Sequence, residues 1–327
     1  MAIRFIALLG AGFSRNWGGW LADEAFEYLL GCPQITPPLR ELLLKHKSKG
    51  GFEAALAELQ AGNVPAVRRS PALVSRFQEA VSSMFFDMDA AFEDVTFEPS
   101  NNVAQSVAAF LTRFDAIFTL NQDLLLERHY LNDNVSLLSN GKWSGWTIPG
   151  LIRQGAGHAD PLTNPNLGLW IPGSESDFHV AGNLQPYFKL HGSSNWNASA
   201  TESVMVIGGN KKSTINRYPI LRFNYEQFHN YLTASDVHLM IIGYGFRDSH
   251  INELILNAVD NSNLRIFVVD PSGIDVIDEN LNAPIHARGV LADTIWPRVI
   301  GASRRSLLST FSSDTVEFRK LLRFFQA

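Results

Sequence analysis

Short apolar runs recur along the chain, and each ends at a glycine or a polar cluster. The first run spans Ile3 to Leu9 and leads into Gly10. A short apolar run bounded by turn residues is typical of a buried strand in a parallel sheet. We therefore predict strands here and at the similar runs 116–120, 187–190, 203–207, 239–242 and 264–269.

Apolar residues at helical spacing separate these runs. They predict helices over 19–30, 248–259 and 314–325, and four more between 37 and 113. Residues 132–185 are rich in Gly, Pro, Asn and Trp, which predicts a long irregular connection with a few hairpin strands. Strands that alternate with helices indicate an α/β protein with a mostly parallel, Rossmann-like sheet.

The 327 residues are about twice the usual length of one domain, so we expect a core with an insertion. The predicted core comprises residues 1–36 and 114–300, the helical insertion 37–113, and a C-terminal helical tail 301–327. The tail has basic residues beside apolar ones. This pattern fits either a contact for a partner or a helix packed on its own sheet.

Composition narrows the class of protein. Hydrophobic residues make up 46% and charged residues 18%, as in a folded globular protein, and the net charge of -5 gives no reason to expect nucleic-acid binding. The single cysteine, Cys32, excludes an intrachain disulfide and a four-cysteine zinc site. The first residues do not have the charged leader that a signal peptide needs, and no run reaches ~18 apolar residues, so we expect no signal peptide, no membrane contact and a cytoplasmic protein.

Four polar clusters follow four of the predicted strands. They are GAGFS at 10–14, TLNQD at 119–123, LHGS at 190–193 and GYGFRD at 243–248. The carboxyl ends of parallel strands meet at one edge of a sheet, where α/β proteins bind ligands. We therefore expect the four clusters to form one site.

Taken singly, the clusters remain ambiguous. Gly10 and Gly12 fit a diphosphate loop or a plain strand-to-helix turn, and the third glycine of the dehydrogenase fingerprint is absent. Asn121 and Asp123 fit a site or a helix N-cap. His191, beside a glycine that would leave one face of the imidazole open, fits a general base or a polar core residue. The other histidines show no metal-binding spacing, and we predict no metal.

The order of the four clusters resembles that of the SIR2-like (sirtuin-fold) family, whose members show GAG-x-S, T-x-N-x-D and HG at the first three. The resemblance covers roughly Ile3 to Pro271 and implies NAD+ as substrate. It implies that Asn121 orients the nicotinamide ribose and a water, and that His191 is the base. The NAD+-binding residues that it implies are Gly10, Ala11, Gly12, Phe13, Ser14, Thr119, Gln122, Asp123, Gly243, Tyr244, Gly245 and Asp270.

The chain departs from the protein deacetylases of that family. It lacks the two Cys-x-x-Cys pairs of their zinc module, and residues 15–20 differ from their G-I-P-D-F-R-like stretch. Together with the helical insertion and the segment IGYGFRDSHIN at 242–252, this zinc-less pattern is similar to that of the bacterial SIR2-like anti-phage effectors. The similarity implies hydrolysis of NAD+ to ADP-ribose and nicotinamide. The alternatives are an NAD+ or ADP-ribose sensor without turnover and an NAD-dependent deacylase. The resemblance also implies a homo-oligomer, or a partner such as a HerA-like ATPase or a short Argonaute.

Overall fold

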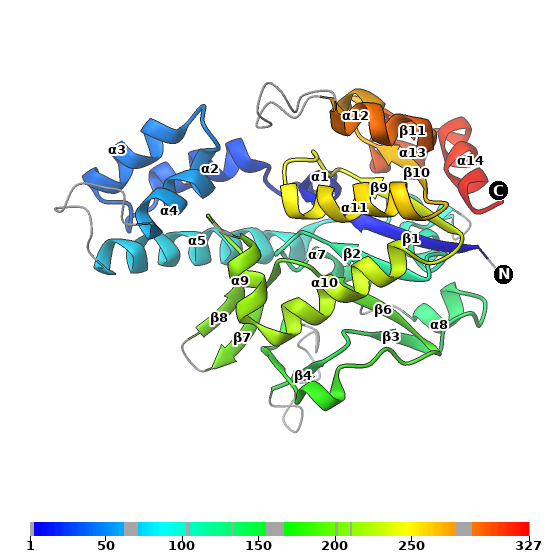
Figure 1. The fold of residues 1–327 in the computed structure, drawn as a ribbon, viewed down its shortest axis with the longest axis horizontal. Helices are drawn as coiled ribbons and strands as arrows, with labels where there is room; N and C mark the ends of the chain where they lie inside the picture. Colours follow the sequence, from blue (N-terminus) through cyan, green and yellow to red (C-terminus); the bar gives the residue numbers. More distant parts are fainter. Residues whose placement is uncertain are drawn as a thin grey trace.

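The computed structural model describes residues 3–61, 71–102, 105–131, 134–154, 167–199, 202–209, 211–278 and 290–326. A parallel sheet crosses the centre of the molecule (Figure 1). Within the described residues it has seven strands in the order β11-β10-β9-β1-β2-β6-β3, and each neighbouring pair is parallel. The strands are β1 (Arg4–Leu9), β2 (Ala116–Thr119), β3 (Gly145–Thr147), β6 (Leu184–Lys189), β9 (Val237–Ile242), β10 (Arg265–Val269) and β11 (Val299–Ser303). The predicted Rossmann-like α/β fold is confirmed.

The register of this sheet brings the strand ends together. Leu9, the last residue of β1, lies beside Thr119 of β2 and Ile242 of β9, and Thr119 lies beside Lys189 of β6. The four polar clusters follow these four adjacent strands. They therefore emerge at the same edge of the sheet, as the sequence predicts.

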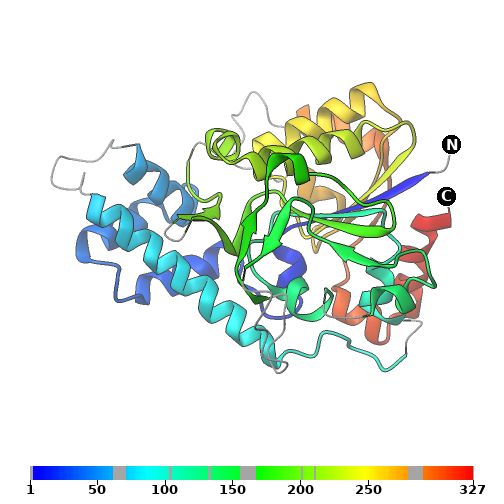
Figure 2. The ribbon, with the colours of Figure 1, turned by 90° about the horizontal axis from the view of Figure 1, so that it is seen from below.

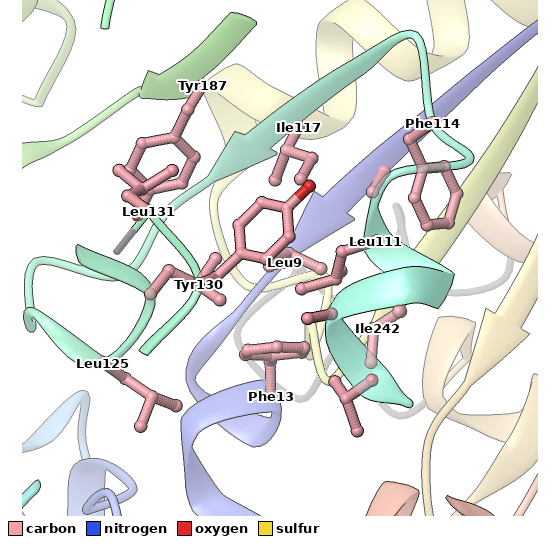
Figure 3. Close-up of a cluster of buried hydrophobic side chains, with 14 of the residues drawn as sticks. Leu9, Phe13, Leu111, Phe114, Ile117, Leu125, Tyr130, Leu131, Tyr187 and Ile242 are labelled. Carbon is pink, nitrogen blue, oxygen red and sulfur yellow. The ribbon is translucent and has the colours of Figure 1, made fainter. Parts of the chain in front are cut away.

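Helices cover both faces of the sheet because its strands are apolar on both sides. Ala7 and Leu9 face one core, and Ile6 and Leu8 face the other, which is the two-residue alternation of a strand. Figure 3 shows part of the first core. It is covered by α1 (Ala11–Arg15), α6 (Val107–Leu111), α7 (Leu125–His129), α8 (Val135–Leu138), α13 (Leu307–Ser312) and α14 (Thr315–Arg323). The second is covered by α10 (Pro219–Leu232), α11 (Ser249–Asn261) and α12 (Val290–Ile295).

A separate helical layer lies beside the sheet, on the left in Figures 1 and 2. Its helices are α2 (Ala22–Gly31), α3 (Pro37–His46), α4 (Gly51–Gln60) and α5 (Pro71–Ala91). They share a core of their own, to which α2 contributes Phe26 and Leu29 although it precedes the predicted insertion. In contrast, α6 packs on the sheet through Val107 and Phe110.

A smaller sheet is formed by strands on both sides of the polar cluster at 190–193 in the sequence. Within the described residues its strand order is β4-β5-β7-β8. The strands are β4 (Leu151–Arg153), β5 (Trp170–Pro172), β7 (Gly192–Ser199) and β8 (Glu202–Met205), and α9 (Lys211–Arg217) comes next. The predicted strand at 203–207 therefore pairs with β7, antiparallel, and does not join the large sheet. Short 3-10 helices complete the fold at Phe92–Asp94, Glu175–Asp177, Gly273–Ile277, Trp296–Arg298 and Phe324–Gln326.

The C-terminal tail packs on its own sheet. Phe318, Leu321 and Phe324 are buried in the first core. Val316 and Arg319 lie on the exposed side of α14. The apolar side of the tail therefore packs on the protein's own sheet, which is the second of the two interpretations. Only the exposed side remains for contact with a partner. None of the described helices is long and apolar enough to span a membrane.

Candidate active site

The site begins with a contact between the first two clusters. Asn121 follows β2, and its Nδ2 donates to Ser14 Oγ on α1 at 2.9 Å. Ser14 is buried and Asn121 is partly exposed. The structure thus brings together two residues that are 107 positions apart in sequence and leaves Asn121 only partly buried.

The glycines of the first and fourth clusters pack directly against each other. The N–H of Gly12 donates to the carbonyl of Gly243 at 2.9 Å, and the N–H of Gly10 donates to the carbonyl of Ile242 at 3.0 Å. A Cβ on Gly10 would lie 2.5 Å from the Gly243 oxygen, and one on Gly243 would lie 2.4 Å from the Gly12 backbone carbon. These two N–H groups are therefore used within the protein, and the glycines are required by the close approach of two backbones. A diphosphate role for this loop stays a prediction.

Several predicted NAD+-binding side chains have contacts inside the protein. Phe13 is buried in the first core. The Tyr244 hydroxyl donates to Asn252 Oδ1 at 2.8 Å. Thr119 Oγ1 donates to the Leu9 carbonyl at 3.3 Å and accepts from the Asn121 N–H at 3.0 Å. These side chains therefore stabilise the loops at the edge of the sheet by packing and by hydrogen bonds within the protein.

Gln122 joins the second cluster to the third. Its Nε2 donates to the carbonyls of His191, at 3.3 Å, and Val206, at 2.8 Å. The backbone carbonyl of Gln122 accepts from the Ser194 N–H at 2.9 Å. The loop that carries Asn121 is thereby tied to the loop that carries His191.

A buried ion pair contacts the second cluster at Asp123. Lys189 Nζ donates to Glu127 Oε1 and to the Asp123 carbonyl, both at 2.6 Å. Burial raises the pKa of Glu127 and of Asp123, and Lys189 opposes both shifts. Asp123 Oδ1 also accepts from the N–H of Leu125, the first residue of α7, but the N-cap position of this helix is Leu124 and not Asp123.

The helical layer reaches this group through Asp89 of α5. Asp89 accepts from the Leu124 N–H and from Ser194 Oγ, both at 2.7 Å. Burial, together with the charge of Asp123, raises the pKa of Asp89 to about 7. No local signal in the sequence points to this residue, because its partners lie on other elements.

The remaining predicted residues lie along the same edge. Ala11 begins α1, and Gly245 is in the turn after β9. Asp270 follows β10, which is separated from β2 by β9 and β1. Asp270 is therefore on the far side of the glycine contact from Asn121, and its Oδ1 accepts from the Ser272 N–H at 2.9 Å.

His191 lies in the turn between β6 and β7 and is only 4% exposed. Gly192 is required here by packing, because a Cβ would lie 1.9 Å from the Val204 oxygen and φ is +74°. The expectation of an open imidazole face is thus wrong for this structure. The ring instead meets His250 of α11, with 2.9 Å between the two Nε2 atoms.

Asp248 and Lys211 complete the surroundings of His191. Lys211 Nζ lies 2.6 Å from Asp248 Oδ1 and 2.8 Å from Glu53 Oε2 of α4. His191, Asp248 and His250 each place one possible metal-ligand atom so that the three atoms lie within 4.8 Å of one another. Two imidazoles and a carboxylate are also donors that zinc accepts. The spacing Asp248-Ser249-His250 is the one signal in the sequence that points to this cluster, but His250 was not among the predicted site residues.

A parallel sheet whose polar loops converge at one carboxyl edge is typical of α/β proteins that bind a ligand at that edge. The family model of the SIR2-like domain matches residues 115–287, more than half of the chain. The chain belongs to the SIR2-like family, whose domains bind NAD+ and are in general NAD-dependent enzymes. No curated protein matches the chain.

Proposed function

We propose that this protein hydrolyses NAD+ to ADP-ribose and nicotinamide. The observation that carries the proposal is the placement of Asn121 and His191 after adjacent strands, on loops that Gln122 ties together. Asn121 would orient the ribose and a water, and His191 would take a proton. The single cysteine, Cys32, is buried in the helical layer, which supports a site without the zinc module of the deacetylases.

The chemistry suits these residues. Cleavage of the nicotinamide–ribose bond passes through an oxocarbenium-like state with a good leaving group. The protein mainly has to hold the ring and stabilise developing charge, to which an oriented amide contributes. A general base adds typically ~10²- to 10⁴-fold in rate.

The test is release of nicotinamide and ADP-ribose from NAD+ by the purified protein, with and without an acylated peptide. We expect release without peptide, and a loss of at least ~10²-fold in Asn121→Ala and His191→Ala. His179→Ala is the matched control, since His179 is exposed. Release that requires the peptide would indicate a deacylase, and NAD+ binding without products would indicate a sensor.

We further propose that the enzyme acts in bacterial anti-phage defence by depleting NAD+, and that its activity is restrained by a homo-oligomer or a partner subunit. Expression of the protein in bacteria that are then infected with phage tests this role. Cellular NAD+ should fall after infection in bacteria that express the wild type, and not in those that express His191→Ala. Unchanged NAD+ with both proteins would contradict the defence role and leave the hydrolase proposal to the purified enzyme.

A further inference from the structure

His250 is the nearest polar partner of the His191 ring among the described residues. The two rings come from different parts of the fold, 59 residues apart, and their Nε2 atoms are 2.9 Å apart. The ring centroids are 5.1 Å apart and the planes are tilted by 32°. His250 is only 2% exposed. The contact is therefore a shielded hydrogen bond.

Protonation limits what this bond can be. Burial lowers the pKa of His191 to about 3 and that of His250 to about 4, so both rings are neutral near pH 7. A hydrogen bond between two neutral Nε2 atoms needs a proton on one and a lone pair on the other. Each ring thus fixes the tautomer of its partner, and Nδ1 is the nitrogen of His191 that remains for substrate.

His250 is itself held in place. The Tyr225 hydroxyl donates to the His250 carbonyl at 2.9 Å, and the Asp248 N–H donates to the Tyr244 hydroxyl at 3.2 Å. Lys211 fixes the Asp248 side chain. These bonds fix the first turn of α11 against its neighbours.

The Asp248 carboxylate supplies charge to both rings. Burial acts to raise its pKa, but the charges of the two rings when they are protonated, and the charge and hydrogen bond of Lys211, lower it to about 2, so that Asp248 is ionised near pH 7. Its charge favours the protonated form of His191 and of His250, whereas Lys211 opposes it. The charge of Lys212 lowers the pKa of His250, and the charge of Glu253 raises it.

We propose that His250 is a positioning residue for His191. His191 donates its Nε2–H to His250, and Nδ1 is then the base. When Nδ1 takes a proton from a ribose hydroxyl or a water, the Nε2–H stays on His191, and Asp248 stabilises the imidazolium. This inference rests on the proposed hydrolase function, and it follows the general principle that a buried carboxylate and a fixed tautomer support a histidine base.

A metal ion is the competing interpretation of the same cluster. The two imidazoles and the carboxylate fit zinc as ligands. However, the Lys211 ammonium already forms an ion pair with Asp248, and its positive charge repels a metal cation. The experiment therefore includes the metal content of the purified protein.

The kinetic arm compares the wild type, His250→Ala, His250→Gln and the control His179→Ala. We expect kcat to fall about 10²-fold in His250→Ala with KM within about 2-fold, because substrate binding is retained while the base is misoriented. His250→Gln should recover part of kcat, since its amide oxygen accepts the Nε2–H. In His250→Ala, the acidic limb of the kcat–pH profile should shift, since the bond to His191 is lost.

The spectroscopic arm records ¹⁵N spectra of histidine-labelled protein, with His191 assigned by the His191→Ala variant. The wild type should show the Nε2–H tautomer of His191, and His250→Ala should show a mixture. A wild-type His191 protonated at Nδ1, or a His250→Ala enzyme with wild-type kcat, would overturn the inference.

Two further outcomes separate the interpretations. Bound zinc in the wild type that is absent in His250→Ala, with activity abolished by chelation, would overturn the positioning role in favour of a metal site. A wild type that releases no nicotinamide would contradict the proposed function alone, because the tautomer spectrum still decides whether His250 orients His191.

Discussion

At the scale of single residues, the glycines of this edge are set by contacts between backbones. Gly243 has φ +64°, and a Cβ there would meet the Gly12 carbon at 2.4 Å. Gly245, two positions later, would place a Cβ no closer than 3.8 Å to the Arg247 side chain. The same motif therefore holds one glycine that the fold requires and one that it tolerates.

We expect Gly243→Ala to lower the free energy of unfolding by about 3 kcal/mol or more, through backbone strain and displacement of the first cluster. Gly245→Ala is the matched control and should change it by no more than about 1 kcal/mol. Urea unfolding followed by circular dichroism measures both. Equal stability of the two variants would contradict the close approach of the two loops.

At the scale of elements, a buried ion pair joins β6 to α7 beneath the site. The side chains of Lys189 and Glu127 are 0% and 1% exposed. The Tyr187 hydroxyl also donates to Glu127 Oε2, at 3.4 Å. A buried pair of this kind is costly to break, because removal of one partner leaves the other charge without compensation.

Lys189→Met should therefore cost about 3–5 kcal/mol in the free energy of unfolding. Adding Glu127→Gln should restore part of that loss, because the uncompensated carboxylate is then removed. The exposed pair of Lys212 and Glu253 offers the control, since both side chains are 57% exposed and Lys212→Met should cost less than ~1 kcal/mol. A double variant that is no more stable than Lys189→Met would argue against charge as the cause.

The elements themselves were largely predictable. The strands at β1, β2, β9 and β10 and the helix α11 lie within a few residues of the predicted ranges, because each combines a clear apolar pattern with a turn signal. The sheet to which β8 belongs was not predictable. Its pairing with β7 depends on the turn at Gly192, which no local period reveals.

At the scale of the whole molecule, the chain folds around two sheet cores and a helical layer. The layer contacts the candidate site through two carboxylates, Asp89 beside the Asn121 loop and Glu53 on Lys211. The C-terminal tail closes the opposite part of the first core, where Phe324 packs against Phe5 and Phe114. The tail therefore contributes to stability.

We expect Phe324→Ala to cost about 3–5 kcal/mol in the free energy of unfolding, because it removes a buried ring from the first core. Val316→Ala on the same tail should cost less than ~1 kcal/mol, since Val316 is 76% exposed. Thermal and urea unfolding test the pair. A Phe324→Ala protein as stable as the wild type would show that the tail does not hold the core.

The sequence by itself determined the fold class, the edge at which the polar clusters meet, and Asn121 and His191 as candidates. Apolar runs and glycine turns are local signals, and parallel strands necessarily gather their carboxyl ends. Only the tertiary structure decided which groups touch: His250 on His191, Asp89 on the Leu124 N–H, and Gly243 on Gly12. These contacts join residues from separate elements, and the pairing of buried polar groups follows from packing in space, which has no period along the chain.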